Sequence, residues 1–284
     1  DIAFLIPPSI GLILYGTLAN ASVGELFIAG IGPGLVLAGL FSLYSYVYSV
    51  KHSDSLTLVD KANAAERIEA VKKAILPLGF PALIIGGIYS GIVTPTEAAS
   101  FAVLYAIIVE CVFYRKLGVK DICDAALNTG LITAVVFVLV GVGQAFSWYI
   151  SFEQIPQELL APLDLGSASP EYILFVIALT FFIGCMFVDS LVVLLILTPI
   201  FMPIVDAAGI DPILVGVMVT LQMAIGSATP PFGCDIFTAI AIFERPYMEV
   251  IRGTLPFFII LIFMSALLIF FPGIALLPRD LLFS

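Results

Sequence analysis

No lysine or arginine occurs between Lys120 and Arg245 in this chain of 284 residues. A soluble domain is charged at about one residue in four, whereas here only 11% of residues are charged and 61% are apolar. A membrane-spanning helix needs about 20 mostly apolar residues, and long apolar runs recur along this chain. The sequence therefore predicts an all-α integral membrane protein with roughly seven to nine spans or hairpin arms.

The same runs argue against other classes of protein. Strands of a membrane barrel alternate apolar and polar residues, but the run from Phe257 to Phe271 is apolar on nearly every face. Eleven scattered basic residues and a net charge of −10 do not make a nucleic-acid surface. The sequence contains no phosphate-binding loop, metalloprotease motif or nucleophile–base pairing. We therefore expect no enzymatic activity and no ATP hydrolysis by this chain.

The cysteines and the single histidine do not indicate a metal or redox site. No C-x-x-C spacing occurs, and most of the cysteines lie in apolar runs, where cysteine behaves as a small buried hydrophobe. His52 lies in a polar loop, and we assign it no function. The four cysteines are Cys111, Cys123, Cys185 and Cys234.

Prolines, glycines and polar residues divide the chain into hydrophobic segments. An amphipathic helix is expected within the polar stretch 51–73, and an acidic loop with short amphipathic character at 151–169. The expected hydrophobic segments are 2–17 (broken at Pro7-Pro8), 26–50, 74–93 (interrupted by Pro and Gly), 96–114, 125–149, 172–188, 191–205, 212–243 (interrupted at 229–231) and 248–271.

Basic loops mark the cytoplasmic side of a membrane protein. The stretches 51–73 and 115–120 carry most of the Lys and Arg, whereas the segments 20–25, 150–170 and 206–211 carry acids without Lys or Arg. We therefore place the first two inside and the other three outside.

The segments 172–188 and 191–205 meet at Asp189 and Ser190. Both arms are shorter than the roughly 20 residues of a full span, and their junction has no Lys or Arg. Loop charge allows either a re-entrant hairpin or two full spans. We favour a re-entrant hairpin at about 171–206.

The chain also matches itself at an offset of 223 residues. Pro7-Pro8 aligns with Pro230-Pro231, and in both copies 21 residues separate the Pro pair from a G-x-x-P motif. Loop charge gives the two copies opposite orientations, and inverted repeats with broken helices are typical of secondary transporters. The alternative is that Pro-Pro merely kinks a helix.

The repeat predicts how the chain is organised. Residues 1–50 are the end of a first inverted repeat, and 51–73 are a cytoplasmic loop with the amphipathic helix. Residues 74–284 are the second repeat. Its parts are scaffold spans at 74–149, the hairpin at about 171–206, a broken helix at 212–243 and a last span at 248–272.

Breaking a helix inside a membrane frees backbone carbonyls, which are hard oxygen ligands for Na⁺. The alternative is a kink whose polar groups are satisfied by neighbouring side chains. The candidate metal residues are Gly226, Ser227, Thr229, Pro230 and Gly233 at the second break, and Pro7 and Pro8 at the first, where Ser9 adds a hydroxyl.

Ionisable residues between apolar segments are the other candidates. Asp189 is costly in a membrane unless it faces water, an ion or a substrate, although an Asp before an apolar helix also caps free amides; Ser190 can share either role. Thr94, Thr96 and Glu97 follow the pattern of a helix start with an acidic first turn. Glu97 is therefore either a helix-capping residue or a proton carrier.

Several motifs, in order along essentially the whole chain, resemble the large membrane (M) subunit of tripartite ATP-independent periplasmic (TRAP) transporters. This DctM-like resemblance implies a Na⁺-driven elevator-type importer of organic acids in a bacterial inner membrane. The motifs are PPSIGLILYG, LFIAGIGPG, GIVTPTEAAS, FVDSLVVLLILTPIFMPI and ATPPFG.

The resemblance also implies partners and site residues. The partners are a small membrane (Q) subunit and a periplasmic substrate-binding (P) protein, and the substrate is a C4-dicarboxylate, sialic acid or a similar acid. Sodium sites carry over to Gly226, Thr229 and Pro230 and to Pro7 and Pro8, and substrate-site residues to Ser9 and Asp189.

The sequence departs from the family in one respect. Family members have a Ser-, Gly- and Ala-rich hairpin before the first Pro-Pro break, and this sequence begins after it. We therefore expect the chain to be N-terminally incomplete and unable to transport alone. The alternative functions are a single-component Na⁺-coupled dicarboxylate or anion carrier and, less in keeping with paired broken helices, a channel.

Overall fold

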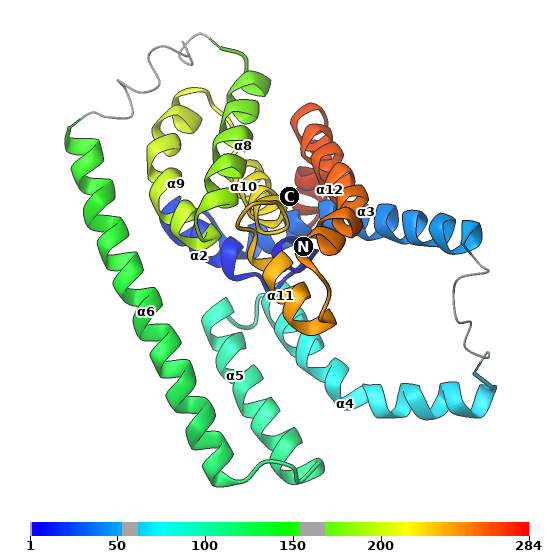
Figure 1. The fold of residues 1–284 in the computed structure, drawn as a ribbon. Helices are drawn as coiled ribbons and strands as arrows, with labels where there is room; N and C mark the ends of the chain where they lie inside the picture. Colours follow the sequence, from blue (N-terminus) through cyan, green and yellow to red (C-terminus); the bar gives the residue numbers. More distant parts are fainter. Residues whose placement is uncertain (1, 53–61, 154–167, 284) are drawn as a thin grey trace. The chain divides into compact units, whose positions relative to one another are not determined.

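The computed structural model describes residues 2–52, 62–153 and 168–283 (Figure 1). The described residues form helices and connecting turns, with no strand among them. Seven of the described helices are long and apolar enough to cross a membrane. The prediction of an all-α membrane protein is therefore confirmed.

The chain divides into two compact units. One consists of residues 1–44 and 138–284, and the other of residues 45–137. The long helices α3 (Val23–Lys51) and α6 (Val119–Phe152) each contribute to both units.

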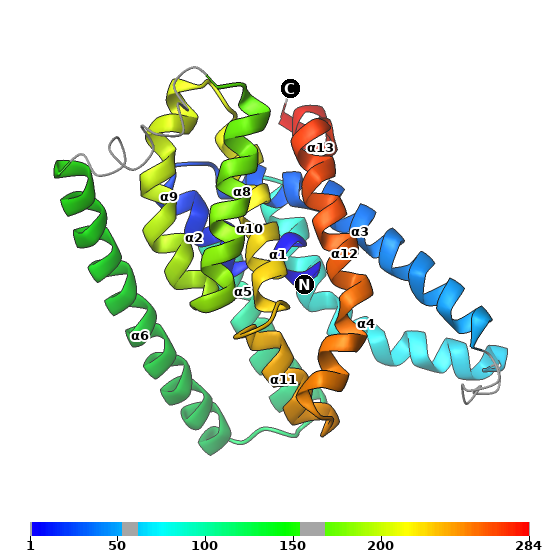
Figure 2. The ribbon, with the colours of Figure 1, turned by 45° about the horizontal axis from the view of Figure 1, so that its top comes forward.

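The larger unit is built around one buried helix. Every residue of α10 from Ile213 to Ser227 is buried, as expected for a helix that is apolar all round. Helices α8, α9, α2 and α12 pack around α10 (Figures 1 and 2). The helices that lie wholly within this unit are α1 (Ile2–Leu5), α2 (Ile10–Leu18), α8 (Pro170–Phe187), α9 (Ser190–Ala207), α10 (Pro212–Ser227), α11 (Cys234–Phe243), α12 (Tyr247–Phe270) and α13 (Gly273–Phe283).

Two glycines of α10 allow this close packing. A Cβ at Gly216 would lie 2.5 Å from the Tyr15 ring, and one at Gly226 would lie 2.2 Å from Cys185 Cβ on α8. Real Cβ atoms do not approach that closely, so neighbouring helices contact the α10 backbone where these glycines lie.

The smaller unit contains α4 (Ala64–Tyr89), α5 (Pro95–Ile108) and a π-helical turn, η2 (Val109–Phe113). Helices α4 and α5 pack together around Ile84, Ala98 and Ala102. Tyr105 donates a hydrogen bond to the Leu76 carbonyl (2.8 Å). It packs against Gly79, where a Cβ would lie 2.1 Å from the tyrosine oxygen.

Most predicted segments are confirmed, with two differences. The amphipathic helix and the interrupted pass expected at 74–93 are one helix, because α4 continues through Pro77 and Pro81. A membrane helix tolerates such prolines where neighbouring groups satisfy the freed carbonyls. Helix α13 follows the last span and was not predicted. Parts of the predicted loops, 53–61 and 154–167, lie outside the described residues.

Candidate functional site

The first Pro-Pro break separates α1 from α2 and is bridged by one serine. In a continuous helix the Phe4 carbonyl would accept from the N–H of residue 8, which Pro8 lacks. The Ser9 hydroxyl donates to that carbonyl instead (2.6 Å). The Ser9 hydroxyl oxygen also accepts a hydrogen bond from the Leu12 N–H (3.4 Å) and so caps α2. Ser9 is only 3% exposed, so its hydroxyl replaces a helix bond inside the protein.

The second break separates α10 from α11 and is bridged differently. Pro230 and Pro231 cannot donate to the Gly226 and Ser227 carbonyls. The Gly226 carbonyl accepts from the Thr229 N–H instead (3.1 Å). The Ser227 hydroxyl donates across the break to Oδ2 of Asp235 (2.9 Å), with the Ala224 carbonyl as a second acceptor (3.0 Å). The peptide bonds Pro7-Pro8 and Pro230-Pro231 are both cis.

Carbonyl oxygens crowd around Gly233 at the end of this break. A Cβ there would lie 2.4 Å from the Ser227 carbonyl oxygen and 2.7 Å from that of Thr229. Only glycine fits, and the oxygens that exclude a Cβ are of the hard type that Na⁺ prefers. Among the described residues no group of three or more His, Cys, Asp or Glu side chains gathers. The oxygens available to a cation at this break are therefore backbone carbonyls, hydroxyls and the single carboxylate of Asp235.

The junction between α8 and α9 presents Asp189 and Ser190. Asp189 caps α9 by accepting from the Leu191 N–H through Oδ1 (3.0 Å). Ser190 donates to the Met223 carbonyl of α10 (3.5 Å). The predicted capping role of Asp189 is confirmed, and the side chain remains exposed.

These three features surround one pocket of about 370 Å³. The predicted residues Pro8, Ser9, Asp189, Ser190 and Ser227 line it. The predicted residues Pro7, Gly226, Thr229, Pro230 and Gly233 belong to the breaks but are not among its lining residues. The full lining is Ala3, Phe4, Pro8, Ser9, Ile10, Gly11, Asp189, Ser190, Leu191, Ser227, Cys234 and Asp235.

Seven of the twelve lining residues were not predicted as site residues, and two of these, Cys234 and Asp235, carry a thiol and a carboxylate. The expectation of a buried cysteine is wrong for Cys234, which is exposed and lines the pocket, and for Cys123; Cys185 is buried as expected. Cys234 is the first residue of α11, so the turn that ends the break presents its thiol instead of burying it. The signal that could have identified Asp235 is a carboxylate placed four residues after Pro231, where a helix restarts.

Thr94, Thr96 and Glu97 belong to the smaller unit, where they begin α5. Thr94 and Glu97 form a capping box in which the Thr94 N–H donates to Glu97 Oε2 (2.8 Å) and the Thr94 oxygen accepts from the Glu97 N–H (3.3 Å). This geometry supports the structural interpretation of Glu97 as a helix-capping residue.

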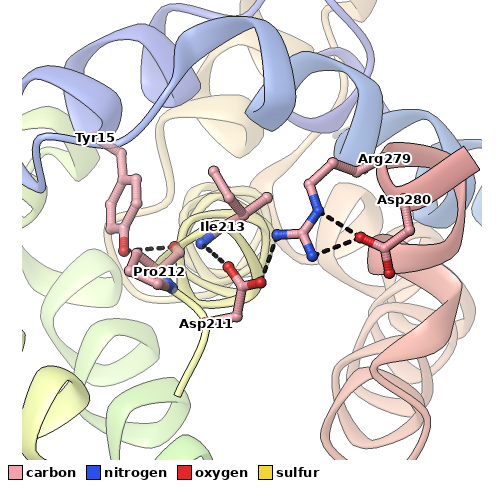
Figure 3. A network of polar contacts seen from close by, with 6 residues as sticks. All are labelled: Tyr15, Asp211, Pro212, Ile213, Arg279 and Asp280. Atoms are coloured by element: carbon pink, nitrogen blue, oxygen red, sulfur yellow. Dashed lines mark hydrogen bonds and ion pairs between the residues drawn. The ribbon is translucent and has the colours of Figure 1, made fainter. Parts of the chain in front are cut away.

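A polar network holds the start of α10 (Figure 3). The pocket residue Ser227 lies at the other end of that helix. Tyr15 of α2 donates to the Pro212 carbonyl (2.8 Å). Asp211 caps α10 through Ile213 N–H (2.8 Å) and pairs with Arg279 of α13, which also binds Asp280. Partial burial lowers the pKa of Arg279, but its hydrogen bonds with both aspartates raise the pKa on balance. Helices α2, α10 and α13 are thereby joined at one point.

The described helices thus define a multi-pass membrane protein with two broken helices facing one pocket. Residues 1–274 match the family model described as the DctM component of tripartite ATP-independent periplasmic transporters. The chain belongs to this bacterial transporter family, as the sequence motifs indicated.

Individual relatives agree with the family match. The chain is 57% identical over 284 residues to the ectoine/5-hydroxyectoine TRAP transporter large permease of Ruegeria pomeroyi. It is also 57% identical over 283 residues to the ectoine TRAP transporter large permease of Halomonas elongata. Each alignment covers 100% of this chain and 66% of the relative. The sialic acid TRAP transporter large permease of Vibrio cholerae is 37% identical over 277 residues, covering 98% of this chain and 64% of the relative.

Proposed function

We propose that this chain forms part of the membrane subunit of a Na⁺-coupled secondary transporter that imports an organic acid. The observation that carries the proposal is the pocket at which the two helix breaks and the α8–α9 junction meet. Substrate and coupling ion of secondary transporters bind where discontinuous helices meet near the membrane midplane.

An elevator-type movement built on two inverted repeats is part of this proposal. The helices α1, α2 and α3 follow the order of α10, α11 and α12, and the two Pro-Pro pairs lie at the same place in each set. We interpret α8 and α9 as the re-entrant hairpin, with Asp189 and Ser190 at its tip. Each arm has 18 residues, fewer than the roughly 20 of a full span, and their junction lines the pocket, which supports this interpretation.

Na⁺ is the proposed coupling ion. The carbonyl oxygens of Ser227 and Thr229 that crowd Gly233 fit a small hard cation. Gly226 and Pro230 shape this break, and Pro7 and Pro8 form the corresponding break of the first repeat. Bound Na⁺ would neutralise part of the negative charge of the pocket and so couple ion binding to substrate binding.

The proposed substrate is an organic acid of the ectoine type. Both relatives with 57% identity carry ectoine in their names, and ectoine is a small cyclic zwitterion with one carboxylate. A pocket of about 370 Å³ accommodates a molecule of that size. The substrate-contacting residues in this proposal are Asp189 and Ser190, whereas Ser9 shapes the pocket wall because its hydroxyl is bound to the backbone on both sides.

Two partners complete the proposed transporter: a small membrane subunit and a periplasmic binding protein that delivers the substrate. The family description, with its tripartite and periplasmic parts, supports this assembly. The second candidate function is a single-component Na⁺-coupled carrier of related architecture. The observation in its favour is that residues of this chain line the pocket.

Uptake by the complete transporter in proteoliposomes tests the proposal. We expect labelled ectoine to accumulate when both the binding protein and an inward Na⁺ gradient are present, and uptake to fall to background without either. Equal uptake without the binding protein would favour the single-component carrier. Equal uptake without the Na⁺ gradient would contradict Na⁺ coupling.

A further inference from the structure

The charge of the pocket is one-sided. Two carboxylates, Asp189 and Asp235, are among its lining residues, and no Lys, Arg or His is. The basic residues that the structure describes in the larger unit are Arg245, Arg252 and Arg279, and none of them lines the pocket. A substrate that carried only negative charge would meet two like charges there and no positively charged side chain.

One oxygen of each carboxylate accepts a hydrogen bond from the protein, and the other oxygen is available to a ligand. Asp189 accepts from the Leu191 N–H through Oδ1, and Asp235 accepts from the Ser227 hydroxyl through Oδ2. Among the described contacts, Asp189 Oδ2 and Asp235 Oδ1 have no hydrogen-bond partner. The protein therefore orients two carboxylates on the pocket without neutralising either one.

We propose that Asp235, together with Asp189, selects substrates that carry a cationic group, and that Asp235 is a specificity-determining residue of this permease. The inference rests on the proposed transport function and assigns Asp235 to the recognition of the cationic group of its zwitterionic substrate. That group, an amidinium or ammonium, donates to the free carboxylate oxygens. The carboxylate of such a substrate would then face the hydroxyl residues of the lining, where Na⁺ bound at the second break would supply positive charge.

Asp235 is the more informative of the two residues because it caps no helix, and its one hydrogen bond, from the Ser227 hydroxyl, can be kept when its charge is removed. Asp189 also caps α9, so its removal weakens a helix start. Helix α11, by contrast, has Gly233 as its N-cap without any side-chain cap bond. Asp235→Asn keeps the size of the side chain and an oxygen that accepts from Ser227, and it removes only the charge.

The first experiment measures selectivity in the complete reconstituted transporter. Labelled ectoine uptake is competed with unlabelled ectoine and with a ring monocarboxylate of similar size that has no cationic group. We expect the parent protein to discriminate between the two, and Asp235→Asn to lose ectoine apparent affinity by roughly tenfold to a hundredfold. Its affinity for the monocarboxylate is expected to stay unchanged or to improve.

Asp206→Asn is the matched control. Asp206 lies near the other end of α9 from Asp189, is exposed and does not line the pocket. The same change of charge at Asp206 is expected to leave both affinities unchanged. An equal loss in Asp206→Asn, or unchanged discrimination in Asp235→Asn, would overturn the proposal.

The second experiment uses Cys234 as a built-in reporter that does not depend on transport. Purified complete transporter in saturating Na⁺ is treated with cationic trimethylammonium-ethyl or anionic sulfonatoethyl methanethiosulfonate. Modification of Cys234 is followed by mass spectrometry, and rates are normalised to those of a free small thiol. We expect the cationic reagent to be favoured on the order of tenfold, and Asp235→Asn to remove most of that preference.

The two readouts separate this inference from the proposed function. If the transporter takes up no organic acid at all, the transport proposal fails, and the Cys234 rates still measure the charge preference of the pocket. If uptake is normal but the two reagents modify Cys234 of the parent protein at equal rates, the inference is wrong and the transport proposal still holds. A preference that is present without Na⁺ and disappears in saturating Na⁺ would also overturn it, because the carboxylates would then bind the ion.

Discussion

The two Pro-Pro breaks lie at the same distance from the G-x-x-P motif that follows each of them, but different groups make the hydrogen bonds that bridge them. At the first, a serine after the break donates back to a carbonyl before it, from Ser9 to Phe4. At the second, a serine before the break donates forward to a carboxylate after it, from Ser227 to Asp235. Both copies of the repeat therefore lose helix hydrogen bonds at the same place, but each copy replaces them with different groups.

This difference gives the breaks different chemical characters. At the first break the Ser9 hydroxyl is buried and committed to the backbone on both sides. At the second, carbonyl oxygens crowd Gly233 and an exposed carboxylate faces the pocket. We infer that the first break mainly preserves structure and the second mainly binds ligands, and three substitution pairs test this comparison.

The largest effect is expected at Gly30, which matches Gly253 in the sequence repeat. A Cβ at Gly30 would lie 2.2 Å from the Leu5 carbonyl oxygen of α1, whereas a Cβ at Gly253 would contact nothing within 4 Å. Gly30→Ala must displace backbone beside the first break and is expected to cost about 3 kcal/mol. Gly253→Ala should be near neutral, since a helix interior prefers Ala.

Thermal melting of the detergent-purified complete transporter, with the yield of monodisperse protein, measures this pair. A Gly30→Ala protein as stable as Gly253→Ala would show that α1 does not depend on the close contact with α3.

The serines that bridge the breaks give the intermediate effect. Ser9→Ala removes a cap of α2 and leaves the Phe4 carbonyl without its donor, at a cost of about 2 kcal/mol. Ser227→Ala removes one hydroxyl whose acceptors are a carboxylate and a carbonyl, at a cost of about 1 kcal/mol. We expect a lower melting temperature for Ser9→Ala, and a stronger effect on ectoine apparent affinity for Ser227→Ala.

An exposed threonine in α11 provides the control for both serines. Thr238 donates to the Cys234 carbonyl from an exposed position, and Thr238→Ala should change neither stability nor affinity. The opposite ranking of the two serine variants would reverse the roles assigned to the two breaks.

The sequence alone predicted the helix breaks because proline removes a donor wherever it lies in a helix. It also indicated helix capping as one of two alternatives for Glu97 and for Asp189, since a cap depends on neighbouring residues only, and the structure shows both caps. It did not predict that α4 continues through Pro77 and Pro81, because that depends on groups that satisfy the freed carbonyls. Features that depend on neighbouring residues could therefore be predicted from the sequence, whereas features that depend on contacts with distant parts of the chain could not.

The site was predicted only in part for the same reason. Asp235 resembles an ordinary residue of a helix first turn until the structure places it on the pocket with Ser9 and Asp189. Helix α13 is short and contains Pro278, and its link to α10 depends on Arg279 meeting an aspartate 68 residues earlier in the chain. No periodicity or spacing rule connects such residues before the fold is known.

The smallest effect is expected at Thr229, whose counterpart in the repeat is Ile6. The Thr229 hydroxyl donates to the Ile225 carbonyl, and its oxygen still has a lone pair for a cation. Thr229→Val keeps the shape of the side chain and is expected to raise the Na⁺ concentration for half-maximal uptake by about threefold, or ~0.6 kcal/mol. Thr229→Ser should restore Na⁺ affinity, and Ile6→Val at the first break should not change it. A Thr229→Val transporter with unchanged Na⁺ dependence would show that the Thr229 hydroxyl does not bind the ion, and the contrast between the two breaks would then rest on Asp235.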